Sequence, residues 1–233
     1  TYVGYRCVDF NILTGCFSTI TLTYAEKNYD YMMQLFYLSS RFSFLLLYAI
    51  ILPLILEVEF ILKLWLGTVG EYMVLFTQLI LVYCLVLAIG NPITIIMQAA
   101  KKVKLYHGVV DSFVLLTLPL SYLFFKLGYP PESTLIISIS MLVIAHAIRI
   151  WAFSKIVVFS LKEYCMQFVF PAIVVVILSV ISTMFIQSLF KNGLIQFVIV
   201  CLSSLLGIGL CSYYIILTSK EKAFLFRIIK KNK

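Results

Sequence analysis

The chain has 233 residues, of which 63% are hydrophobic and 12% charged, with a formal net charge of +8 and a mean hydropathy of +1.07. A water-soluble domain of this length would expose large apolar patches with such a composition. The composition therefore excludes an ordinary soluble domain and predicts a chain built from membrane spans of roughly 20 residues each.

Six apolar stretches have the length that a helix needs to cross a bilayer. In chain order they cover roughly 42–62, 73–97, 106–127, 133–154, 165–188 and 194–217. Residues 1–22 form a seventh, partial span that begins without Met or a targeting pattern, so we expect the chain to start inside a longer protein. The stretches are longer than barrel strands and apolar on all sides, which favours helices. The expected fold class is all-α, a polytopic membrane helix bundle.

Two connections have the composition of amphipathic helices that lie on a membrane surface. The first, "TYAEKNYDYMMQLFYLSSR" at 23–41, mixes charges with aromatic and Met residues and is expected along the cytoplasmic surface. The second, "EVEFILKLWLGTVGEY" at 57–72, is expected on the outer side, with Trp65 at the level of the lipid headgroups. No connection is long enough to hold a soluble domain.

Basic residues are distributed unequally between the two sides of the predicted spans. Thirteen of the 18 fall in alternate connections and the C-terminal tail, against three in the other connections. The positive-inside tendency makes the richer set and the C-terminus cytoplasmic, where the basic tail suits anionic lipid; nucleic acid is not an expected partner. The richer set holds Lys27, Arg41, Lys101, Lys102, Lys104, Lys155, Lys162 and six residues from Lys220 onward, and the poorer set holds Lys63, Lys126 and Lys191.

The sequence offers no arrangement typical of an enzyme, so we expect no catalytic residues, no cofactor and no metal. The two histidines, His107 and His146, have no second ligand at metal-binding spacing, and there is no Ser/His/Asp set or Gly-rich phosphate loop. The cysteines lack a CxxC pair and are read as small hydrophobic residues. They are Cys7, Cys16, Cys84, Cys165, Cys201 and Cys211.

Charged residues at membrane depth are the first candidates for function. Asp111 and Arg149 lie roughly 10 and 9 Å of helix rise from the basic cytoplasmic ends of their helices, so the two side chains could meet. His146 shares a helix face with Arg149. Such charges can have a structural role, in which they snorkel to the headgroups or hold neighbouring helices together. Alternatively, they line a substrate cavity. Arg6 and Asp9, also three residues apart, admit the same two interpretations.

A polar stripe and several prolines give a second indication of a cavity. The segment "GNPITIIMQ" places Asn91, Thr94 and Gln98 on one side of an otherwise apolar helix. The stripe could bind sugar hydroxyls or pack against a neighbouring helix. Four spans also contain a proline, which removes a backbone donor and tends to kink a helix. These are Pro53, Pro92, Pro119 and Pro171.

Two long segments resemble a known family. "SSRFSFLLLYAIILPLILEVEFILKLWLG" at 39–67 and the segment from "EYMVLFTQLILVYCLVLAIGNPITIIMQ" to "LFFKLGYPPE" at 71–132 are similar to the C-terminal half of bacterial polysaccharide biosynthesis flippases. These are the O-antigen type transporters of the superfamily that also contains multidrug-and-toxin exporters. The resemblance implies the C-terminal lobe of a two-lobe, MATE-like transporter with a central cavity.

The resemblance also implies a division of the chain. Residues 1–160 would hold the second to sixth helices of the C-terminal lobe, the first of them partial. Residues 161–219 would hold two additional C-terminal helices, and residues 220–233 a basic cytoplasmic tail. The missing N-terminal lobe of the same protein and the membrane lipids are then expected partners.

The function that the resemblance implies is the flipping of an undecaprenyl-diphosphate-linked oligosaccharide across the bacterial inner membrane. A cavity for an anionic diphosphate and hydroxyl-rich sugars needs cations beside polar groups. Two arginines would supply the charge, two aspartates would orient them or couple to an ion, and polar side chains would complete the lining. The candidates are Arg6, Asp9, Asn91, Gln98, Asp111, His146 and Arg149.

Two other classes of protein remain open at this point. A multidrug or small-cation exporter of the same superfamily would share the fold and topology. A membrane polymerase or ligase of the polysaccharide pathway would share the composition, but it predicts a large external loop, and the outer connections here are short. A lumen rich in acidic residues would favour the exporter.

Overall fold

The computed structural model describes residues 12–100, 108, 112–155, 159–189 and 193–216, and these residues form helices joined by short turns. No strand occurs in these ranges. The elements are α1 (Ile12–Ala25), α2 (Tyr29–Leu56), α3 (Val58–Leu66), α4 (Met73–Ala99), α6 (Thr117–Lys126), α7 (Ser133–Ser154), α8 (Leu161–Tyr164), the π-helical turn η2 (Cys165–Val169), α9 (Phe170–Leu189), α10 (Gly193–Cys211) and the π-helical turn η3 (Ser212–Ile216).

Five helical segments of the described chain are long and apolar enough to cross a membrane. They confirm the all-α, multi-pass membrane helix bundle predicted from composition. A sixth predicted span, 106–127, lies partly outside the described residues, and its described part is the shorter apolar helical stretch Ser112–Lys126. The five long segments are Tyr29–Leu56, Met73–Ala99, Ser133–Ser154, Leu161–Leu189 and Gly193–Ile215.

The segment 23–41 is not the separate surface helix that the sequence predicted. Helix α1 ends at Ala25, a tight turn follows in which Lys27 has φ 58°, and α2 then runs without interruption from Tyr29 to Leu56. The side chain of Asn28 accepts a hydrogen bond from the Tyr31 amide and caps the new helix. At 1.5 Å per residue, α2 is about 42 Å long, more than the roughly 30 Å hydrocarbon core of a bilayer.

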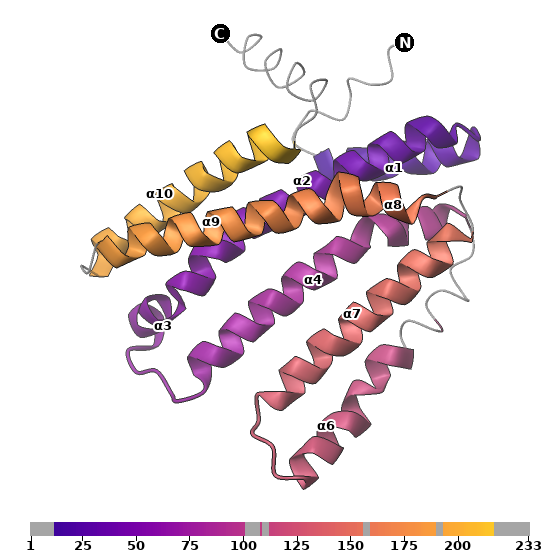
Figure 1. The fold of residues 1–233 in the computed structure, drawn as a ribbon. Coiled ribbons are helices and arrows are strands. Elements are labelled where there is room, and N and C mark those ends of the chain that lie inside the picture. Colours follow the sequence, from indigo (N-terminus) through magenta and orange to yellow (C-terminus); the bar gives the residue numbers. More distant parts are fainter. Residues whose placement is uncertain (1–11, 101–107, 109–111, 156–158, 190–192, 217–233) are drawn as a thin grey trace.

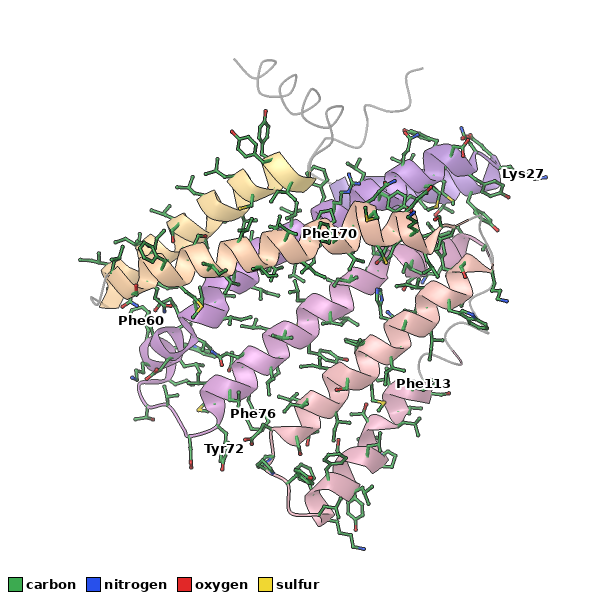
Figure 2. The ribbon with its side chains drawn as sticks, in the orientation of Figure 1. Lys27, Phe60, Tyr72, Phe76, Phe113 and Phe170 are labelled. Carbon is green, nitrogen blue, oxygen red and sulfur yellow. The ribbon has the colours of Figure 1, made fainter. Side chains whose placement is uncertain are left out.

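The helices form a row of neighbours (Figure 1). The α9–α10 hairpin packs on α2, α2 packs on α4, α4 packs on α7, and α7 packs on α6, while α1 covers parts of α2 and α4. Lys27, in the turn before α2, and Tyr72, before α4, lie at opposite ends of the bundle (Figure 2). This arrangement agrees with the sequence, which assigned these two connections to opposite sides of the membrane.

The most buried part of the molecule is an aromatic cluster around the first half of α2. Phe36 is fully buried, and its ring centroid lies 5.4 Å from Phe153 at the end of α7 and 6.1 Å from Tyr164 in α8. Phe159 completes the cluster at 4.9 Å from Phe153. Aromatic pairs at such distances contribute about 0.5–1.5 kcal/mol each beyond burial. The cluster therefore ties the end of α7, the short helix α8 and the connection between them to the segment that the sequence predicted to lie on the surface.

Large apolar side chains cover the outside of the bundle. Phe170 on α9, which is labelled in Figure 2, is 63% exposed, and exposed leucines and isoleucines continue along α9 and α10. A soluble protein seldom exposes such continuous apolar faces, but hydrocarbon solvates them. The outer surface is therefore that of a membrane protein.

Candidate functional site

The exposed face of α4 changes from apolar to polar along its length. In the half that begins at Met73, this face presents Ile80 and Leu87, whereas beyond Gly90 it presents Asn91 and Gln98. Asn91 and Gln98 are two helical turns apart and therefore lie one above the other. Amide side chains on a span are poorly solvated by hydrocarbon. This half of the face consequently suits water or a polar partner better than lipid.

Thr94, the third member of the predicted stripe, turns back to its own helix. Its Oγ1 donates a hydrogen bond to the Gly90 carbonyl at 3.1 Å, and its side chain is half-buried. Such bonds to the carbonyl four residues earlier are common for threonine in helices. The exposed polar stripe is therefore formed by the two amides.

Gly90 is the point at which α7 places its polar residues against α4. A methyl group on the Gly90 Cα would collide with Nη1 of Arg149 and would lie 3.6 Å from Cζ of the same guanidinium. It would also lie 3.4 Å from Nδ1 of His146. The missing side chain of Gly90 thus leaves a space that the two polar residues of α7 enter. We call this contact the Gly90 slot, formed by Gly90, His146 and Arg149.

The Gly90 slot follows from two regular features of the sequence. His146 and Arg149 are three residues apart on α7 and share one helix face. Glycine at position 90 allows α7 to approach α4 there, and Gly90 is buried by this contact. Nδ1 of His146 is buried and has no hydrogen-bond partner among the described residues. The slot therefore combines a guanidinium with a buried imidazole nitrogen whose hydrogen-bonding capacity is not used by the described residues.

The structure describes four of the seven candidate residues from the sequence. It brings His146 and Arg149 together at Gly90, whereas Asn91, the next residue of α4, and Gln98, two turns further, lie on the exposed face of that helix. Arg6, Asp9 and Asp111 lie outside the described residues. In the part of the chain that the structure describes, no group of three or more His, Cys, Asp or Glu residues is placed to hold a metal ion.

Arg41 is a buried cation that the sequence analysis assigned to a connection. It lies within α2, is 7% exposed, and its Nε donates a hydrogen bond to the Gln167 carbonyl at 3.1 Å. Tyr37, one turn earlier on α2, has a buried hydroxyl with no hydrogen-bond partner in the described residues. One feature of the sequence could have placed Arg41 inside a helix. The apolar periodicity of 29–41 continues into the next span without a Gly or Pro to interrupt it.

A second polar cluster, which the sequence analysis also missed, lies at the break between α2 and α3. Glu57 is only 6% exposed, and its Oε1 accepts a hydrogen bond from Nε2 of Gln187 on α9 at 3.0 Å. The same amide donates to the Leu56 carbonyl at 3.2 Å, and Gln78 on α4 donates to the Ile55 carbonyl at 3.2 Å. Carbonyls at the end of a helix lack partners within it. The two glutamines supply these partners and connect the break to α4 and α9.

Comparisons with known proteins add no identification. No family model, no curated protein and no solved structure matches the chain. The fold and its composition define a multi-pass, all-α membrane protein with a polar slot between two of its spans.

Proposed function

We propose that this chain is part of a flippase that moves an undecaprenyl-diphosphate-linked oligosaccharide across the bacterial inner membrane for surface polysaccharide synthesis. The observation that carries the proposal is the Gly90 slot, in which Arg149 lies between α7 and α4, at the residue of α4 beyond which its exposed face becomes polar. A charged side chain at membrane depth is a candidate for a substrate path because its burial in lipid is unfavourable.

The chemistry of the slot matches the chemistry of that substrate. A guanidinium binds phosphate oxygens through parallel, charge-assisted hydrogen bonds, and the exposed amides of Asn91 and Gln98 can bind sugar hydroxyls. Alternating access in such transporters places the binding site near the middle of the membrane between two lobes. Under this proposal, α4 and α7 contribute one wall of the cavity, and an N-terminal lobe outside this chain contributes the other.

The alternative is a multidrug or small-cation exporter of the same superfamily, with a polysaccharide polymerase third. The exporter would need an acidic binding wall, whereas the described charge at the slot is the Arg149 cation. A polymerase would need catalytic side chains on an outer loop. The two described connections that the sequence assigns to the outer side, 67–72 and 127–132, are both short.

The test is transport by the full-length protein in proteoliposomes. Flipping of a fluorescent undecaprenyl-diphosphate saccharide is followed by the fraction of label that a membrane-impermeant reductant can reach. We expect the full-length protein to accelerate this exchange and the Arg149→Gln variant to slow it. Efflux of a cationic dye without any exchange of the lipid-linked saccharide would instead identify the exporter.

A further inference from the structure

Among the described span glycines, Gly90 differs in what fills the space beside its Cα. At Gly209 on α10, a methyl group would meet no heavy atom within 4 Å, and at Gly207 it would meet Oγ of Ser182 at 3.4 Å. At Gly90 the space is occupied by the guanidinium of Arg149. The position of this cation thus depends on residue 90 having no side chain.

The collision predicted at Gly90 involves the far end of a flexible side chain. An alanine at position 90 can be accommodated if the guanidinium of Arg149 rotates away, because its side chain has several rotatable bonds. Alanine is also a better helix former than glycine. A Gly90→Ala protein should therefore fold, with the main consequence that the cation is displaced from α4.

We propose that Gly90 is a positioning residue, which lets the Arg149 guanidinium lie against α4 at the residue that precedes Asn91 and thereby gives the slot its affinity for a diphosphate. The inference rests on the proposed function and assigns the diphosphate, rather than the saccharide, to this point of the cavity wall. A guanidinium makes two parallel hydrogen bonds to a phosphate only when its plane is fixed. Under this inference, the close contact with Gly90 on α4 limits how that plane can turn before the ligand arrives.

The experiment measures binding of inorganic pyrophosphate to the full-length protein in lipid nanodiscs. Four variants are compared with the native chain: Gly90→Ala, Arg149→Gln, the double variant, and Gly209→Ala as a matched control in a span helix. Loss of a charge-assisted hydrogen bond corresponds to about tenfold to hundredfold weaker binding. We expect this loss for Gly90→Ala and no loss for Gly209→Ala. The double variant should bind no more weakly than Arg149→Gln alone, because Gly90 acts through Arg149.

Two further readouts separate positioning from a structural role. The melting temperature of Gly90→Ala should stay close to that of Gly209→Ala although its pyrophosphate binding is weakened. Gly90→Ala combined with Arg149→Lys should recover part of the binding, since the compact ammonium of lysine needs less space beside the new methyl group.

The outcomes that would overturn the inference are distinct from those that would overturn the proposed function. Native-like pyrophosphate binding by Gly90→Ala would refute the positioning role and leave the flippase proposal standing. A large fall in the Gly90→Ala melting temperature together with lost binding would make Gly90 a structural residue. Absence of pyrophosphate binding by the native protein would refute the diphosphate site, and the inference with it.

Discussion

Arg41 in α2 donates a hydrogen bond from Nε to the carbonyl of Gln167 at 3.1 Å, across 126 residues of sequence. In a regular α-helix this carbonyl would accept from the amide four residues later. That residue is Pro171, which has no N–H to donate. The π-helical turn η2 lies at the same place, where the Phe170 amide donates to the carbonyl of Cys165, five residues earlier. A buried arginine in one span thus supplies the donor that a proline removes from another.

This relationship predicts an interaction energy between Arg41 and Pro171. Arg41→Met should destabilise the full-length protein by about 1–3 kcal/mol, because it leaves a carbonyl without its donor in a dry environment. In a Pro171→Ala background the new amide can donate to the same carbonyl, so Arg41→Met should be less destabilising there. Denaturation of the four proteins in detergent gives the interaction energy as a double-mutant cycle.

A matched control separates this effect from the loss of a positive charge. Lys162→Met removes a cation from the exposed side of α8 and should leave stability nearly unchanged. Effects of Arg41→Met and Pro171→Ala that simply add would contradict the relationship between the two residues.

The sequence predicted most of the spans because hydropathy alone sets their position in a bilayer. The stretch 133–154 coincides with α7, and the stretch 73–97 ends two residues before α4 does. The short helix predicted within 57–72 is present as α3, and its Trp65 is 80% exposed. These features depend only on local composition, so a single sequence contains enough information to locate them.

The sequence analysis was wrong about the start of α2 because polar residues were taken as the mark of a connection. Ser40 and Arg41 lie in the middle of the helix, where Ser40 Oγ donates to the Phe36 carbonyl and Arg41 donates to Gln167. The contact of Gly90 with Arg149 was missed for a related reason. Partners that come together only when distant helices pack leave no periodic signal in the chain.

The break between α2 and α3 gives the next prediction. Gln187→Leu should destabilise the full-length protein by about 1–3 kcal/mol, because it removes the amide that serves both the Leu56 carbonyl and the buried carboxylate of Glu57. Chemical denaturation in detergent measures the change. Gln196→Leu on α10 is the control, since this side chain makes no hydrogen bond with the described residues and the substitution is chemically the same.

A nearby ion pair shows the contrast between exposed and buried carboxylates. Lys63 lies 2.6 Å from Oε1 of Glu59, and its hydrogen bond and charge hold the pKa of Glu59 below the usual value. Both side chains are exposed, so solvent screens the interaction. Glu59→Gln should therefore leave the melting temperature unchanged, and an effect as large as that of Gln187→Leu would show that α3 is held by its surface charges.

The arrangement of the bundle predicts which positions a membrane-impermeant reagent reaches. Asp30 at the start of α2 and Glu71 before α4 are exposed, and they follow the two turns that lie at opposite ends of the bundle. In intact cells we expect maleimide labelling of Glu71→Cys, and labelling of Asp30→Cys only after permeabilisation. The reverse labelling pattern would invert the topology.

The last prediction concerns Asp111, which lies outside the described residues, and its proposed partner Arg149. Helix α6 packs on α7 and joins it through the short connection 127–132, so the helix that contains Asp111 in the sequence prediction would run antiparallel to α7. The two residues are expected at similar depths, roughly 10 and 9 Å from the cytoplasmic ends of their helices. A direct pair would bring the carboxylate and the guanidinium within about 4 Å.

The double-mutant cycle of Asp111→Asn and Arg149→Gln in the full-length protein tests this pair. If the two charges compensate each other inside the bundle, each single change leaves a charge of one sign in a medium of low dielectric constant. Each should then impair both stability and transport of the lipid-linked saccharide, and the double change should be less damaging than the sum of the two. If both side chains snorkel to the headgroups instead, each change should be nearly neutral and the effects should add. Additive effects, or an Asp111→Asn protein with native transport, would therefore show that Asp111 is not the partner of Arg149.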